Sequence, residues 1–432
     1  MKKLKIVLIG AGSRSFGRKT IADIISNVLL NELKIDLWLV DINKKSLDLM
    51  HKFAVLTKKY YKRKNISISA TIDRVKALEN ADYVITAVAT NRVQFWQADF
   101  FIPHSFGFQH VFGENGGIGG AFHALNNLGI MIPIAKDMEK LCPEALLMNF
   151  TNPESRIVMG VTKLTKINAV GLCHGFYDSH MLVHKILNKK SGEVDIDIGG
   201  INHFHWTLRI RDVKTGKDLL DEFHNKLRAR MDELPPLIRY MFKTFGYVPF
   251  PVDDHIGEFV SFGYSMIGPL FIDHQYKHMI SNKNPVKDPF LDSIRKKRIV
   301  SKDLVKPSRE IAVSIICDIE FDRGNKVPSV NILNSDSFIE NIDRDAIVEI
   351  PATVDKNGIR GVKVPRLPEG IAAMCRQQVS IQKLLVEAFA EKSRKKLLQV
   401  FTIDPTVTDV KNLEQMLEMM YKIEGDFLPV LH

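Results

Sequence analysis

A cysteine and a histidine in two separate loops are the residues of this chain best suited to bind a metal ion. Cys173 lies in the Gly-Leu-Cys-His-Gly stretch at residues 171–175, directly after an apolar segment, and His203 lies in a histidine-rich turn at residues 200–206. A thiolate and an imidazole can bind a borderline divalent ion and leave positions open for water and substrate oxygens. Buried structural Cys and His residues are common, so residue type and spacing alone favour a structural role over a metal site.

Two further loops carry polar groups in patterns that suit a reacting site. Asn149 and Asn152 lie in the turn at residues 149–153, where their amides could bind sugar or nicotinamide groups. An Asx turn before the proline is an equally favoured interpretation. Residues 253–258 concentrate three carboxylates and an imidazole, a composition that suits proton transfer or metal support. Charged loops of this kind are more often simply solvated, so this loop alone decides nothing.

A glycine turn near the amino terminus has the context of a dinucleotide-binding turn. Gly10, Gly12 and Ser13 follow the apolar residues 4–9 and precede apolar residues at helical spacing. Backbone N–H groups and the positive end of the helix dipole would meet there, where a pyrophosphate can bind. Asp41 ends the next strand-like segment and is placed to bind a ribose 2′-OH; with no arginine directly after it, it favours NAD over NADP. The usual third glycine is replaced by serine, and an ordinary tight βα turn is the alternative.

The elements that would position these residues alternate between strand and helix. Beyond residues 4–9, strands are expected at residues 35–40, 66–70, 83–88, 145–148 and 169–172, with helices such as 132–141 between them. This pattern predicts an α/β fold with a Rossmann-type, doubly wound parallel sheet. From about residue 195 the alternation weakens, with isolated strands near 346–350 and 362–364 and long helices near 371–392 and 412–423. We therefore predict an NAD-binding domain at 1–195 and an α/β substrate-binding and oligomerisation domain at 196–432.

Composition excludes several classes of protein. The net charge of +10 comes from scattered basic residues, which indicates a solvated surface and no nucleic-acid partner, although an anionic substrate stays open. No run approaches the ~20 apolar residues of a membrane span, so we expect no membrane partner. No signal peptide is evident. The four cysteines lie far apart without CxxC spacing, which argues against disulfides or a structural zinc site and predicts a cytoplasmic location.

Taken in order, these segments resemble glycoside hydrolase family 4, the NAD-dependent glycosidases. Any one motif is weak, but their order and spacing together are specific. The resemblance implies a lactate- and malate-dehydrogenase-like first domain, and it raises the metal interpretation of the Cys-His pair above the structural one. The residues that carry it are 10–13, 113–120, 149–153, 173–175, 202–203, 254–258, 384–388 and 404–405.

The chemistry implied by the resemblance is an elimination, an exception to the two-carboxylate scheme of most glycosidases. NAD⁺ would take hydride from C3 of the sugar, and Mn²⁺ or another divalent metal on Cys173 and His203 would polarise the resulting ketone and acidify the C2 proton. A base would remove that proton, and the aglycone would leave from C1. Water would then add at C1, and hydride would return to C3.

Further roles follow from the resemblance by position. Asp254 is the expected base, and Tyr264 is the fallback. His174, next to the metal cysteine, would assist departure of the aglycone or orient the site. Asn152 would hold sugar hydroxyls, and Asn149 would lie near the nicotinamide.

Departures from the family pattern narrow the substrate. Phospho-sugar members carry Cys-Asp or Cys-Asn where this chain has Cys173-His174, so an unphosphorylated α-glucoside, α-galactoside or α-uronide is expected. Trp96 stands near the place of an arginine in those members and would stack on a sugar face or pack in the core. The resemblance also implies a homodimer or homotetramer. A 2-hydroxy-acid dehydrogenase of the malate and lactate type, which needs no metal, is the alternative enzyme, and an NAD-sensing binding protein is the non-enzymatic alternative.

Overall fold

The computed structural model describes residues 1–89, 91–270, 288–308 and 310–432. Over these residues one continuous sheet has the strand order β3-β2-β1-β4-β5-β6-β9-β10-β7-β8, with β11 paired to β10. The predicted α/β fold with a parallel sheet is confirmed for the first half of this order. The strands are β1 (Lys3–Ile9), β2 (Lys34–Val40), β3 (Ile66–Thr71), β4 (Tyr83–Thr86), β5 (Leu146–Asn149), β6 (Ala169–Gly171), β7 (Val194–Ile201), β8 (Phe204–Asp212), β9 (Asn325–Leu333), β10 (Ile347–Asp355) and β11 (Gly358–Gly361).

The parallel strands all end at one edge of the sheet. Ile9 pairs with Val40 on one side and with Thr86 on the other. Thr86 pairs in turn with Asn149, and Asn149 pairs with Gly171. The loops that follow these strands therefore lie side by side, which is where ligands bind in open α/β sheets.

The second half of the sheet is antiparallel. β6 meets β9 at Gly171 and Asn331, β9 pairs with β10, and β7 pairs with β8. Residues 346–350, expected as an isolated strand, begin β10 inside the sheet. Residues 362–364 are not a strand, because the hairpin partner of β10 ends at Gly361. The predicted domain boundary falls within β7, and the division into two domains stays a prediction.

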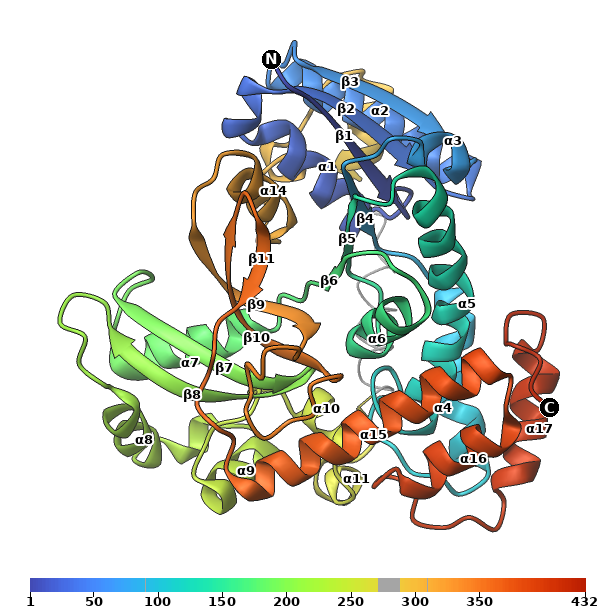
Figure 1. The fold of residues 1–432 in the computed structure, drawn as a ribbon, viewed down its shortest axis with the longest axis vertical. Coiled ribbons are helices and arrows are strands. Elements are labelled where there is room, and N and C mark those ends of the chain that lie inside the picture. The colour runs from blue at the N-terminus through green and yellow to red at the C-terminus, as the bar shows by residue number, and fades with distance from the viewer. Residues whose placement is uncertain (90, 271–287, 309) are drawn as a thin grey trace.

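Helices pack beside the sheet and form the end of the molecule that lies opposite β1–β3 (Figure 1). Figure 1 shows α1 and α2 beside β1–β3, and α15 running across the opposite end of the molecule toward α16, α17 and the C-terminus. The helices are α1 (Phe16–Ser26), α2 (Lys44–Tyr60), α3 (Arg74–Leu78), α4 (Arg92–Ser105), α5 (Gly117–Leu141), α6 (Glu154–Leu164), α7 (Phe176–Leu187), α8 (Leu220–Arg228), α9 (Pro236–Phe245), α10 (Asp253–Ile256), α11 (Gly263–Ile267), α13 (Pro289–Arg295), α14 (Ala312–Glu320), α15 (Glu369–Glu391), α16 (Arg394–Ile403) and α17 (Leu413–Glu424), with 3-10 turns η1 (Leu29–Glu32), η2 (Met231–Glu233), η3 (Gly257–Phe259) and η4 (Lys302–Leu304).

Local sequence explains where several helices begin and end. The side chain of Asn43 accepts the Ser46 N–H at the start of α2, which satisfies one free donor of the first turn. Helix α9 begins with Pro236, and Gly246 directly after its end lies in the left-handed region, at φ +73°, as is usual for helix ends. Among the described residues, α5 is the one helix long and apolar enough to cross a membrane. However, 83% of its most apolar stretch is buried inside the protein, as in the core helix of a globular protein.

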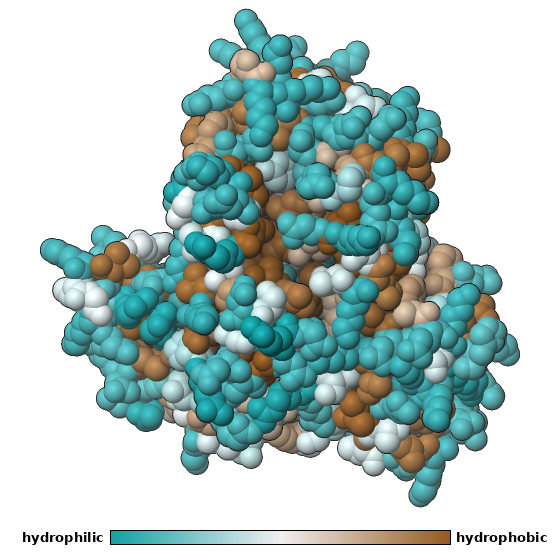
Figure 2. Space-filling model, viewed as in Figure 1, coloured by the Kyte–Doolittle hydropathy of each residue, from teal (hydrophilic) through white to brown (hydrophobic). Residues whose placement is uncertain are grey.

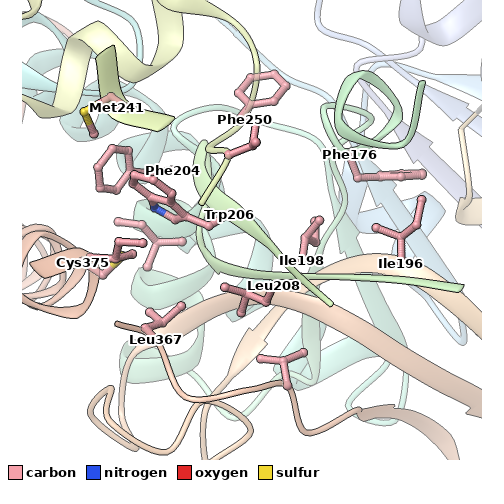
Figure 3. Packing of buried hydrophobic residues seen from close by; sticks show 14 of the residues in the cluster. Phe176, Ile196, Ile198, Phe204, Trp206, Leu208, Met241, Phe250, Leu367 and Cys375 are labelled. Atoms are coloured by element: carbon pink, nitrogen blue, oxygen red, sulfur yellow. The ribbon is translucent and has the colours of Figure 1, made fainter. Parts of the chain in front are cut away.

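Large apolar side chains fill the space between the antiparallel strands and their helices. Figure 3 shows Phe204 and Trp206 of β8 close to Met241 of α9 and Cys375 of α15. On the surface, Figure 2 shows hydrophobic side chains gathering in the recessed middle of the viewed face. This packing holds β7 and β8 against α9 and α15.

Candidate active site

Two adjoining cavities lie at the edge where the parallel strands end. The first, of about 500 Å³, is lined by the glycine turn, and the second, of about 420 Å³, is lined by Cys173 and His203. The two cavities share part of their walls and therefore lie side by side. The shared residues are Phe16, Arg92, Glu114, Phe150 and Asn152.

The glycine turn brings four of the five predicted cofactor residues to the first cavity, namely Gly10, Gly12, Ser13 and Asp41. Gly10 has φ +88°, and a Cβ there would lie 2.1 Å from the Ala87 carbonyl oxygen, so the position requires glycine. The Gly12 N–H donates to Asp41 Oδ2 at 2.8 Å. This hydrogen bond joins the turn to the acidic residue.

Asn149, the fifth predicted cofactor residue, is not among the described residues that line the two cavities. Its Oδ1 accepts the Thr86 hydroxyl and the Thr151 N–H, both at 3.1 Å, and its Nδ2 donates to the Thr151 carbonyl at 3.0 Å. The buried amide therefore shapes the turn that presents Asn152, which lines both cavities. Contact of Asn149 with a nicotinamide stays a prediction.

The predicted metal ligands meet in the second cavity. Cys173 Sγ lies 3.1 Å from His203 Nε2, and the Gly175 N–H donates to the same sulfur at 3.3 Å. Burial, with the nearby Glu349 and Glu154, raises the pKa of the Cys173 thiol well above its usual value. Burial lowers the pKa of His203 and keeps its imidazole neutral, the form that binds metals.

Among the described residues, few side chains near Cys173 and His203 could coordinate a metal ion. Nδ1 of His203 and Oδ1 of Asp254 are buried without a hydrogen-bond partner in the described part of the chain. No group of three or more His, Cys, Asp or Glu side chains there is arranged as a metal site. The role of Cys173 and His203 as metal ligands stays a prediction, and two protein ligands would leave positions open for water and substrate.

The acidic loop after residue 252 is a structural part of the site rather than a solvated loop. Asp253 accepts the Leu237 and Ile238 N–H groups at the start of α9. Asp254 lines the second cavity. Glu258 is fully buried. The three carboxylates of this segment therefore have different surroundings, which composition alone could not distinguish.

His174 is paired with a residue that the sequence did not single out. Its Nδ1 lies 3.3 Å from Glu310 Oε1, and both side chains line the second cavity. The hydrogen bond to Glu310 raises the pKa of His174. Glu310 lies in a loop far from His174 in sequence, and no motif marks it. Arg92 and Glu154, which also line this cavity, were missed for the same reason.

Trp96 and Tyr264 have different positions. Trp96 is buried at the wall of the second cavity, and its Nε1–H donates to the Phe112 carbonyl at 3.2 Å. It therefore packs in the core and also lines the cavity, and its contact with a sugar stays a prediction. Tyr264 packs against the cluster of Trp96, Phe100, Val111 and Phe112. It is not among the described residues that line the two cavities. Its role as a base stays a prediction.

Comparison with known proteins gives matches over the whole chain. Residues 5–189 match the model of the family 4 glycosyl hydrolases, and residues 198–407 match that of the family 4 glycosyl hydrolase C-terminal domain. The chain is 28% identical to an alpha-glucosidase of Erwinia rhapontici, with 99% of each covered. It is 27% identical to an alpha-galactosidase of Bacillus subtilis (strain 168), over 98% of this chain and 99% of the relative.

Solved structures share the fold. A 6-phospho-alpha-glucosidase from gut microorganisms, in complex with NAD and Mn²⁺, superposes with a TM-score of 0.82 at 21% identity over all of both chains. A malate dehydrogenase from Plasmodium falciparum superposes with a TM-score of 0.51 at 14% identity, over 90% of this chain and 99% of the other. The dehydrogenase-like architecture expected from the sequence is therefore confirmed.

Proposed function

Because the chain belongs to the family 4 glycosyl hydrolases, we propose that its two adjoining cavities form one active site that hydrolyses an unphosphorylated α-glycoside. The observation that carries the proposal is the shared wall. It sets the Cys173 and His203 pair beside a dinucleotide-type glycine turn. A 2-hydroxy-acid dehydrogenase would need the glycine turn but not the pair.

The residues present fit both cofactors. The turn at Gly10 and Gly12 leaves no room for a side chain and, together with Asp41, lines the first cavity, which suits NAD. A cation would shift Cys173 from thiol to thiolate, and His203 is already neutral. When bound, NAD and a divalent metal such as Mn²⁺ would supply transient oxidation at C3 and polarisation of the carbonyl formed there.

The chain's own residues would then move protons. Asp254, with one carboxylate oxygen unpartnered, would accept the C2 proton of the sugar. His174, with Nδ1 on Glu310, would donate a proton to the departing glycosidic oxygen. The Asn152 amide, 3.5 Å from Glu114 Oε1, would hold sugar hydroxyls at the shared wall. Trp96 would contact the sugar at the outer wall.

Charge in the second cavity favours an uncharged sugar. Among the described residues, the ionisable side chains that line it, apart from Cys173 and the histidines, are the acidic Glu114, Glu154, Asp178, Asp254 and Glu310 and the basic Arg92. Arg92 lies 3.5 Å from Glu114, and burial raises the pKa of Glu154 well above its usual value. A phosphate would meet several carboxylates and one guanidinium that is already paired. Away from the metal ion this charge balance disfavours an anionic group, so among the expected substrates we infer an α-glucoside or α-galactoside rather than an α-uronide.

The setting of the enzyme is also a proposal. All four cysteines are unpaired, which suits the reducing cytoplasm. A homodimer or homotetramer rests on the family resemblance alone.

Isotope exchange tests the mechanism. The protein is incubated with NAD⁺, Mn²⁺ and a reductant in deuterated water, with aryl α-glucoside, α-galactoside, α-glucuronide and 6-phospho-α-glucoside in parallel. We expect turnover of a neutral glycoside and deuterium at C2 of the released sugar. Cys173→Ser should bind NAD normally but lose turnover and Mn²⁺ affinity by about 100-fold. Hydrolysis without deuterium at C2 would rule out the elimination, and hydrolysis that survives chelation would rule out a catalytic metal on Cys173 and His203.

A further inference from the structure

Glu258 is a buried carboxylate that the proposed mechanism does not use. It lies in η3, directly after the helix that carries Asp254, and it is 0% exposed. It lines neither cavity, so it touches neither sugar nor cofactor. A buried charge of this kind is unfavourable unless several donors surround it.

Those donors come from the loop in front of α5. Glu258 Oε1 accepts the backbone N–H groups of Glu114 at 2.6 Å, Asn115 at 2.9 Å and Gly116 at 3.4 Å. The Asn115 side-chain amide donates to Oε2 at 3.3 Å. Three consecutive N–H groups at the start of a long helix form an anion-binding nest, and the helix dipole adds to it.

The backbones on the two sides are in direct contact. A Cβ at Gly116 would lie 2.1 Å from the Glu258 carbonyl oxygen. The loop before α5 and the segment that carries Asp254 are therefore packed without space for a side chain. This contact, together with the carboxylate, leaves little freedom for one segment to move against the other.

Each side of this junction carries a group that faces the second cavity. On one side Glu114 lines both cavities and lies 3.5 Å from both Arg92 and Asn152. On the other side, the His255 ring stacks on the His203 ring with centroids 4.6 Å apart, and Asp254 directly precedes His255 in the chain. His255 Nδ1 also lies 3.9 Å from Glu258 Oε2.

We propose that Glu258 is a positioning residue: its carboxylate joins the loop that carries Glu114 to the segment that carries Asp254, and so fixes the base relative to the sugar. This inference rests on the proposed function, because it takes Asp254 as the base. Misplacement of a reacting group by about 1 Å costs about 100-fold in rate, so the loss of this junction should appear in the deprotonation step rather than in cofactor binding.

Glu258→Gln tests the inference with little change in shape. The glutamine oxygen can still accept the three N–H groups, but its NH₂ then faces the Asn115 amide, donor against donor. We expect kcat to fall about 10- to 100-fold. The deuterium isotope effect measured with C2-deuterated substrate should rise above that of the wild type, with NAD affinity unchanged.

Asp318→Asn is the matched control. Asp318 is a buried carboxylate of α14 that accepts the Asn325 amide at 2.8 Å and lines neither cavity. A purely structural role for Glu258 predicts that both variants lower Tm and that kcat and the C2 isotope effect stay at wild-type values in the folded enzyme. That result would overturn the inference.

Asn115→Ala covers the case in which Glu258→Gln does not fold, since it removes one donor to Oε2 and leaves the carboxylate in place. A smaller rise of the C2 isotope effect supports the inference, and an unchanged isotope effect in the folded variant overturns it. Absence of C2 exchange in the wild type would instead overturn the proposed function itself, so the two failures are distinguishable.

Discussion

Two carboxyl groups buried away from the cavities, Asp99 of α4 and Glu424 of α17, make stability depend on pH. Burial raises the pKa of Glu424 to about 7, and burial together with the charge of Glu424 raises the pKa of Asp99 well above its usual value. Glu424 is held by the Asn126 amide at 2.7 Å. The folded protein therefore keeps a proton on Glu424 at pH values where the unfolded chain has lost it.

Glu424→Gln should become progressively stabilising as the pH rises. In the wild type the free energy of unfolding falls as the pH rises from about 4.5, the ordinary pKa of the group, to about 7, its folded value. The neutral amide avoids this loss and still accepts the Asn126 N–H. At pH 8 we expect the variant to be more stable by as much as about 3 kcal/mol, with no gain near pH 4.

Urea unfolding of both proteins between pH 4 and 8 measures this difference. Burial also lowers the pKa values of His110 and His123, to about 3 and about 4, but their effect cancels when variant and wild type are compared at each pH. Glu418→Gln, at an exposed position of the same helix, should show no such trend. A stability difference that does not vary with pH would contradict the prediction.

At the residue scale, the sequence could identify groups whose chemistry is local or whose motif is shared with a family. Cys173, His203, Asn152 and Asp254 were all predicted, and they line one cavity. Glu310 could not be found, because its function depends on a contact with His174 that only the folded chain creates.

At the element scale, the first turns of α5 require glycine for packing rather than for flexibility. A Cβ at Gly120 would lie 2.6 Å from the Asn115 backbone carbon, whereas a Cβ at the exposed Gly129 of the same helix would meet nothing closer than 3.6 Å. Alanine is normally favoured over glycine in a helix by about 1 kcal/mol. The two positions should therefore respond in opposite directions.

Gly129→Ala should stabilise the protein by up to about 1 kcal/mol and leave activity unchanged. Gly120→Ala should destabilise it and lower kcat, since the loop that carries Glu114 must shift to admit the methyl group. Thermal unfolding and steady-state kinetics of both variants check the prediction. Stabilisation at both positions would show that the loop before α5 moves to admit the methyl group without lowering the stability of the protein.

Strands and helices were predicted well where their own residues show a clear pattern of apolar and polar positions. The apolar runs at residues 4–9 and 35–40 are β1 and β2, and the helix expected at 371–392 is α15 (Glu369–Glu391). The pairing of the later strands could not be read from the sequence. Residues 346–350 looked isolated because β9 and β7, which flank β10, lie in separate parts of the chain.

At the scale of the whole molecule, the sheet crosses the predicted domain boundary. β6 pairs with β9 at Gly171 and Asn331, so the first half of the sheet does not end at a free edge. Later residues also complete the core of the first half. Those that pack with β1, β2, α1 and α2 include Phe290, Val305, Ala312, Ile315, Ile316, Cys317 and Val327.

The fragment 1–195 should therefore not fold on its own, although it contains the whole glycine turn. Without residues 288–333 it would expose the apolar surface that Phe290 and Ile315 cover, and β6 would lose its partner. We expect weak near-ultraviolet circular dichroism, binding of a hydrophobic dye and no cooperative unfolding transition. Co-expression with residues 196–432 should restore a single transition like that of the intact chain. A sharp, independent transition of the fragment, with NAD bound, would instead mean that the second half joins a nucleotide-binding unit already stable by itself, and the shared sheet would then be an interface between two domains rather than one core.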